Sequence, residues 1–209
     1  MESYSTTIRK IFLLCFLIST AMYGGDVFWN NPSGGNWSDG TNWDTGLAPQ
    51  PGDNVFITLD GTYTITLDVN MDVNSLALGA ATGTQTLAAT SRTLNATIGM
   101  TINANGVLQL DNSNTVNAGI TSTGTIYIRG QGNTMNGALT LQTGSLMLLD
   151  ASVSHSIITF NNTVNNSGTI RLEDNVVNSR ICRISTGASG VVNNLAGGTV
   201  ISTGTVGSR

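Results

Sequence analysis

The chain has few charged residues, and this shortage limits the partners it can bind. Asp, Glu, Lys and Arg make up 10% of the 209 residues, whereas about a quarter is usual in globular proteins. Lys10 is the only lysine, and the arginines that follow it are scattered. Nucleic-acid binding depends on clustered basic side chains that neutralise phosphates, so we expect no nucleic-acid partner.

Cysteine and histidine are nearly absent, which removes most disulfide and metal chemistry. Cys15 lies in an apolar N-terminal stretch and Cys182 is the only other cysteine, so the chain without that stretch cannot form an intrachain disulfide. His155 is the single histidine and has no cysteine or carboxylate close by in sequence. We therefore predict no catalytic residues, no metal site and no cofactor.

Long apolar runs are also missing. The run at residues 11–18 is too short to span a bilayer. It follows Arg9 and Lys10 and precedes small residues ending at Ala21, which is the pattern of a secretory signal. We predict that residues 1–21 are a signal peptide. The mature chain then has a net charge of −5, because the formal charge of −4 loses Arg9, Lys10 and Glu2. We expect it to be secreted, extracellular or at the cell surface, with no membrane span.

The chain does have a repeated five-residue unit, in which a glycine is followed by aliphatic residues at the second and fourth places. The glycines lie 18, 20, 24 and 30 residues apart, and they are Gly106, Gly124, Gly144, Gly168 and Gly198. Repeats of this length are typical of stacked arrays. Side chains alternate along a strand, so the second and fourth places share one face, which we predict to be buried.

The predicted core therefore consists of two columns that follow these glycines. The second-place column is Leu108, Ile126, Leu146, Ile170 and Val200, and the fourth-place column is Leu110, Ile128, Leu148, Leu172 and Ser202. The third place is chemically mixed and is predicted to be exposed. Replacing Leu146 with Asp should unfold the protein by burying an unpaired charge, whereas Met147 should tolerate substitution.

The segments between the units are rich in Gly and Asn and poor in helix formers, which excludes crossover helices. We predict an all-β parallel β-helix, or β-solenoid, of roughly seven coils over residues 60–209, at about 20 residues a coil. An ordinary β-sandwich is the alternative. Asp60-Gly61 is expected to form a hairpin turn. Asparagines that follow aliphatic residues are expected at left-handed corners, namely Asn95, Asn117, Asn136, Asn165 and Asn193.

Residues 22–59 differ from the rest of the chain, because they hold all its tryptophans and prolines. We predict that they form an N-terminal cap over the first coil, whose strand edge and open core need cover. Trp29, Trp37 and Trp43 are expected to pack inside this cap, and the alternative is a stacking platform for sugars. At the other end, Ser202 replaces an aliphatic residue. We expect the C-terminal coil to pair with another molecule, or the protein to continue beyond it.

Other chemistry has weaker support. Asp111, Arg129 and Glu173 share the fifth place after their glycines, although Leu149 interrupts the column, and we interpret them as a ladder of charges. Two further sets have the residue types of a weak calcium site and of an ice-binding threonine array. They are Asp39, Asp44 and Asp53, and Thr62, Thr82, Thr101, Thr121, Thr140 and Thr159.

Six segments carry a resemblance to a known group of proteins: 37–43 (WSDGTNW), 49–57 (PQPGDNVFI), 61–67 (GTYTITL), 73–79 (VNSLALG), 105–110 (NGVLQL) and 166–170 (NSGTI). They resemble the opening, first coils and repeats of large secreted bacterial surface proteins, the adhesins and autotransporter passengers. The resemblance implies a parallel β-helical shaft and no shared catalytic residues. We therefore expect a non-enzymatic structural or adhesin-like surface module. Its partners would be cell-surface or matrix glycans, or a second copy bound through the C-terminal coil. A β-helical polysaccharide-degrading enzyme is the less favoured alternative.

Overall fold

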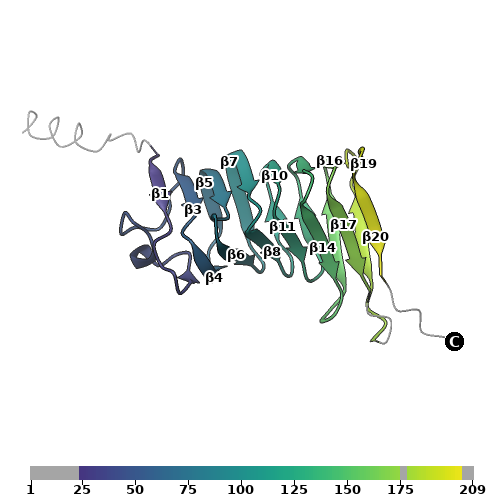
Figure 1. Ribbon diagram of the computed structural model, residues 1–209, viewed down its shortest axis with the longest axis horizontal. Coiled ribbons are helices and arrows are strands. Elements are labelled where there is room, and N and C mark those ends of the chain that lie inside the picture. The colour runs from purple at the N-terminus through teal and green to yellow at the C-terminus, as the bar shows by residue number, and fades with distance from the viewer. Residues whose placement is uncertain (1–23, 175–177, 204–209) are drawn as a thin grey trace, which may run out of the picture.

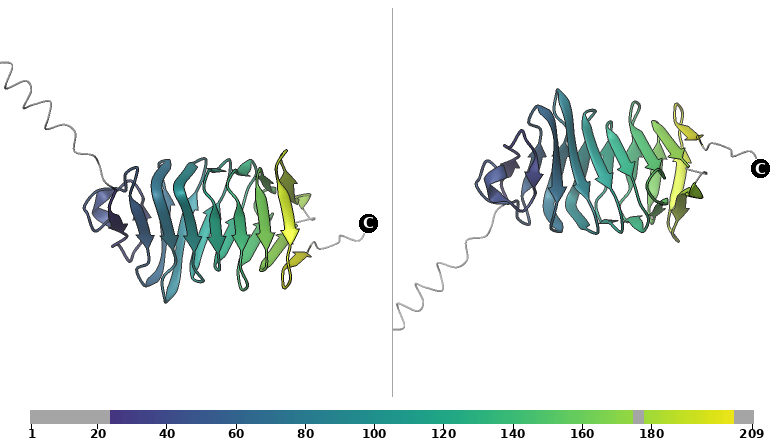
Figure 2. Two further views of the ribbon diagram at one scale, coloured as in Figure 1. Left: turned by 90° about the horizontal axis from the view of Figure 1, so that it is seen from above. Right: turned by 90° about the horizontal axis from the view of Figure 1, so that it is seen from below.

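Strands of successive turns lie side by side along the molecule in two long parallel sheets (Figure 1). The computed structural model describes residues 24–174 and 178–203, so the predicted signal peptide lies outside the described residues. The chain is a β-solenoid, as predicted. Its strands follow one another along the long axis in sequence order, from purple at one end to yellow at the other (Figure 2).

The first sheet holds one strand from each turn. Its eight strands are, in order, β2 (Gly35–Asn36), β4 (Gly61–Leu67), β6 (Gly83–Ala89), β8 (Gly106–Leu110), β11 (Thr125–Ile128), β14 (Leu146–Asp150), β17 (Thr169–Glu173) and β20 (Thr199–Ser202). Seven of them, from β4 to β20, lie beyond residue 60 and are separated by six full turns, close to the seven coils expected.

The second sheet has twelve strands and divides into two faces. One face, called here the β10 face, runs through β1 (Asp26–Phe28), β3 (Asn54–Ile57), β5 (Met71–Leu78), β7 (Thr93–Ile102), β10 (Ile120–Ser122), β13 (Leu139–Leu141), β16 (Thr163–Asn166) and β19 (Val191–Asn194). The other branches from β7 through β9 (Thr115–Val116), β12 (Asn133–Met135), β15 (Ser156–Phe160) and β18 (Cys182–Thr186). Because β7 pairs with both β9 and β10, each turn from β8 onward has three strands.

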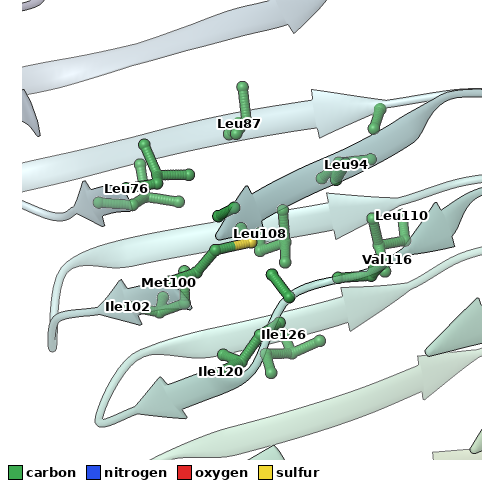
Figure 3. Close-up of a cluster of buried hydrophobic side chains, with 14 of the residues drawn as sticks. Leu76, Leu87, Leu94, Met100, Ile102, Leu108, Leu110, Val116, Ile120 and Ile126 are labelled. Carbon is green, nitrogen blue, oxygen red and sulfur yellow. The ribbon is translucent and has the colours of Figure 1, made fainter. Parts of the chain in front are cut away.

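The core is a stack of aliphatic side chains inside this spiral (Figure 3). Leu108 pairs in register with Ile126, and both are fully buried. Full burial of one such side chain stabilises the fold by about 1.5–3 kcal/mol. This burial is repeated in successive turns, and it compensates for the small number of charged residues and for the lack of a disulfide in the described residues.

One turn departs from the predicted facing. Met147 and Leu149 are fully buried, whereas Leu146 and Leu148 lie on the outer side and are only half-buried. In register, Ile126 pairs with Met147, and Met147 pairs with Ile170. The prediction that Leu146 and Leu148 are core residues and that Met147 is exposed is therefore wrong.

The cause is that the repeated glycines are of two kinds. Gly106, Gly124 and Gly168 occupy a corner where an added Cβ would lie 2.1–2.3 Å from an atom of the preceding turn. Gly144 instead has φ +90° and no atom near its Cβ position, so it serves a turn conformation that favours glycine. The corner place in that turn falls to Ser145, one residue later, which shifts the strand by one residue.

Two smaller predictions are also wrong. Asp60-Gly61 is not a hairpin turn, because β3 and β4 belong to different sheets and the dipeptide forms a corner between them. The asparagines do not adopt left-handed backbone, since the non-glycine residues with positive φ in the described chain are serines. The side chains of Asn95, Asn117, Asn136 and Asn161 instead form an amide ladder between turns, with N–O distances of 2.6–2.9 Å.

Candidate functional site

The three tryptophans of the cap pack against one another inside it, as predicted. Trp43 packs edge-on against both Trp29 and Trp37, with ring centroids 4.9 Å apart in each pair. Each indole is 2% exposed. The Trp29 Nε1 donates to the Asn31 carbonyl at 2.6 Å and the Trp43 Nε1 to the Trp37 carbonyl at 2.9 Å. Glycan binding by these residues stays a prediction, and in this conformation their ring faces are enclosed.

The aspartates of the cap bind backbone N–H groups. Asp44 accepts from the Phe28 N–H at 2.8 Å, and Asp53 accepts from the Gly25 N–H at 2.9 Å and the Gln50 N–H at 2.7 Å. Asp39 accepts from Thr41 at the start of the short 3-10 helix η1 (Gly40–Asn42). In residues 24–174 and 178–203, no three His, Cys, Asp or Glu side chains gather to hold a metal ion. These carboxylates hold the loops of the cap together through hydrogen bonds from backbone N–H groups.

The column of charges on the eight-stranded sheet is continuous, because the shift in β14 brings Asp150 to the place expected for Leu149. Asp150 pairs in register with Glu173. Arg129 binds Asp111 in a bidentate ion pair, with Nε–Oδ1 2.9 Å and Nη2–Oδ2 3.3 Å. The ladder of charges predicted from the sequence thus includes one more carboxylate.

Tyr127 links this column across two turns. Its hydroxyl donates to Asp150 Oδ2, and the Arg129 guanidinium lies 5.9 Å from its ring centroid. Burial and the bond to Asp150 raise the pKa of Tyr127 to about 12. Partial burial alone would raise the pKa of Asp150, but the hydrogen bonds from Tyr127 and Ser152 outweigh it and lower that pKa below 3.8. Asp150 is therefore ionised at neutral pH and cannot supply a proton as a general acid.

The side chains of His155 and Cys182 also have hydrogen-bond partners. The Nδ1 atom of His155 accepts from the Ile181 N–H at 3.2 Å, and the Sγ atom of Cys182 lies 3.1 Å from the Leu149 carbonyl. Burial, followed by the nearby carboxylate of Asp174, raises the pKa of Cys182 to about 12, so it remains a thiol at neutral pH. Neither residue lies in an arrangement suited to nucleophilic catalysis.

The six threonines spaced 19–20 residues apart in the sequence divide among three places. Thr101, Thr121 and Thr140 stand in register on adjacent strands of the β10 face. Thr159 belongs to another column, with Thr134 and Thr115. Thr62 lies on β4 in the eight-stranded sheet, and Thr82 precedes β6. Sequence spacing alone could not separate these sets, because the loop lengths differ between turns.

Sequence reasoning missed an aromatic pair on the β10 face. The rings of Phe28 and Phe56 are stacked, with centroids 4.8 Å apart and planes at 16°, and Phe28 is 42% exposed. The two residues are neighbours in register on β1 and β3. The only available signal was their position next to residues with the pattern of a strand. The 25 residues between the two strands, which include β2 and η1, hid their pairing.

Comparison of the chain with models of protein families, with curated proteins and with solved structures found no match. Within the part of the chain that is described, no helix has the length and apolar character needed to cross a membrane.

Proposed function

We propose that this protein is a secreted, non-enzymatic β-solenoid module, structural or adhesin-like, that acts at a cell surface or in an extracellular matrix. The observation that carries the proposal is the uninterrupted parallel stack with a buried core from β3 to β17 and a cap of packed tryptophans at one end. Such a stack makes a stiff shaft that can present a surface at a distance. The secretory pattern of residues 1–21 supports the location.

The state of the titratable side chains supports a role without turnover. Polysaccharide cleavage needs a base or acid free to move a proton to or from the substrate. On the outer face of the eight-stranded sheet, Arg129 is paired with Asp111, and Asp150 accepts hydrogen bonds from Tyr127 and Ser152. Arg171 Nε lies 2.8 Å from Glu173 Oε1 but has no hydrogen-bond partner, so this pair is a charge contact.

The test is to incubate the mature protein with neutral and acidic polysaccharides and to measure new reducing ends. We expect none. Release of reducing ends that is lost in Arg129→Gln or Arg171→Gln, with thermal stability kept, would establish the enzyme alternative instead.

We also propose that the last described turn is the end through which copies associate. Val200 is 54% exposed and Val191 50%, whereas Ile170 in the preceding turn is fully buried. In the described chain, β18, β19 and β20 each pair on one side only. Arg183 is the single charge on these strands, so two copies would repel each other little. The cap occupies the opposite end, which favours tail-to-tail contact.

Sedimentation of the mature protein over a range of concentrations tests this. We expect a monomer–dimer equilibrium that Val200→Asp abolishes and Leu47→Asp leaves intact, because Leu47 is exposed in the cap at the opposite end. A strict monomer at all concentrations would contradict association while leaving the shaft unaffected.

A further inference from the structure

A single outward column of uncharged residues runs the whole length of the β10 face. Its eight members are paired in register from one strand to the next, and they are Phe28, Phe56, Ala77, Thr101, Thr121, Thr140, Asn165 and Asn193. Seven steps of about 4.8 Å make a strip of roughly 34 Å. The strands that carry it can be followed from β1 to β19 in Figure 1. We call this column the Phe–Thr strip.

One end of the strip is aromatic and open to solvent. Phe28 stacks on Phe56 yet remains 42% exposed, whereas Trp29, next to it in sequence, is 2% exposed. The cap thus buries the ring of Trp29 and leaves the adjacent phenylalanine pair at its surface. Exposed aromatic rings beside polar groups are typical of binding surfaces, since each ring offers a rigid apolar face.

The middle of the strip carries hydroxyl groups that are free to bond a ligand. Thr101 and Thr121 are exposed, and in the described residues their Oγ1 atoms bond to no protein group, nor does that of Thr140. By contrast, the side-chain amide of Asn117 donates a hydrogen bond to the Asn95 Oδ1 atom in the neighbouring turn. The threonine column therefore keeps a regular row of donors and acceptors toward solvent.

The surroundings of the strip select for an uncharged ligand that lies close to the sheet. The neighbouring outward column, two residues earlier, passes through the small residues Ser75, Gly99, Gly119 and Ala138. A chain lying on the threonines would meet little obstruction there. Asp26 is the only charged residue in the two columns, so a polyanion or polycation would lose hydration without gaining a partner.

We propose that the Phe–Thr strip binds an extended, neutral, β-1,4-linked polysaccharide. The phenylalanine pair stacks on a sugar ring at one end, and the threonine hydroxyls bond to sugar hydroxyls along the chain. The rise per sugar of such a polymer is similar to the spacing between strands, so successive sugars can meet successive rungs. The inference rests on the proposed role as a surface module and specifies its ligand class, replacing the enclosed tryptophans with a different aromatic site.

The test uses affinity electrophoresis of the mature protein in gels that contain a soluble β-1,4-glucan or xylan, with polygalacturonate and dextran sulfate as charged polymers. Phe28→Ala and Thr121→Val alter the strip. Val153→Ala and Thr134→Val are matched controls, because Val153 is an exposed loop residue and Thr134 an outward threonine on the branch of β12. We expect retardation by the neutral polymers alone, unaffected by salt, and weakened at least about five-fold by the strip variants only.

Three results would overturn the inference. They are absence of retardation by every neutral polymer, equal effects of Thr121→Val and Thr134→Val, or retardation that salt abolishes. A dimer in sedimentation that Phe28→Ala dissociates would assign the strip to a second copy. If the protein binds no neutral polymer and releases no reducing ends, only the proposed ligand is rejected. If it releases reducing ends, the proposed non-enzymatic function is rejected as well.

Discussion

At the scale of single residues, buried polar groups decide local stability. Ser156 is fully buried and its Oγ donates to the Ile128 carbonyl at 2.7 Å. Ser122 is also fully buried, but its Oγ has no hydrogen-bond partner, and it lies in register between Ile102 and Leu141. The two serines therefore form a natural pair in which burial is equal and hydrogen bonding differs.

Ser122→Ala should stabilise the protein by roughly 1 kcal/mol, because it removes an unsatisfied hydroxyl from the core. Ser156→Ala should destabilise it by a similar amount, because it removes a bond that a buried carbonyl needs. Urea unfolding of the two variants and the parent checks this. A loss of stability in Ser122→Ala would mean that its hydroxyl has a partner.

Asp68 connects the cap to the shaft and makes the fold sensitive to acid. It accepts hydrogen bonds from the Ser38 N–H at 3.0 Å and the Ser38 hydroxyl at 2.6 Å. Partial burial raises its pKa, but these two bonds outweigh burial and lower the pKa below 3.8. A lowered pKa in the folded state adds stability above the unfolded value, and this stability is lost as the pH falls through the folded value.

We therefore expect the melting temperature to fall as the pH is lowered from about 6 to 3, with most of the loss below about pH 4. Asp68→Asn should melt earlier at neutral pH and show a shallower loss in acid. Parallel curves for the variant and the parent would show that Asp68 has no part in the acid response.

At the scale of elements, the distinction between corner and turn glycines sets the register of each strand. The alternation of aliphatic residues in β8, β11 and β17 was sufficient to predict strands, their parallel stacking and their buried side. The facing of β14 could not be predicted, because Gly144 looks like the corner glycines in sequence. The difference lies in its positive φ and in the backbone atoms that approach the other corners.

Gly124→Ala should destabilise the protein by about 1–3 kcal/mol, because the new Cβ would lie 2.1 Å from the Asn103 carbonyl oxygen. Gly119→Ala is the control, since its Cβ would lie 3.8 Å from the nearest atom and its φ is not positive. We expect no loss there, and a gain of up to about 1 kcal/mol from the less flexible unfolded chain. Thermal melts that rank the two variants in the opposite order would contradict the corner assignment.

At the scale of the whole molecule, the sequence predicted the shaft and the cap but not the surface. The cap was predictable because all tryptophans and prolines fall within residues 22–59. The Phe–Thr strip was not, because its members lie 19–28 residues apart at varying intervals and meet only through the register between turns. The division of the twelve-stranded sheet at β7 could not be predicted either, because it also depends on the register between turns.

The stacked core is tested most directly by comparing Met147→Asp with Leu146→Asp by circular dichroism and thermal unfolding. With Ile126, Met147 and Ile170 stacked inside one spiral, Met147→Asp buries an unpaired charge at a cost of several kcal/mol, a large part of the stability of an ordinary domain. Leu146→Asp puts its charge on the outer side and should leave the protein folded. Retention of the fold in Met147→Asp, or unfolding of both variants alike, would contradict the stacked core.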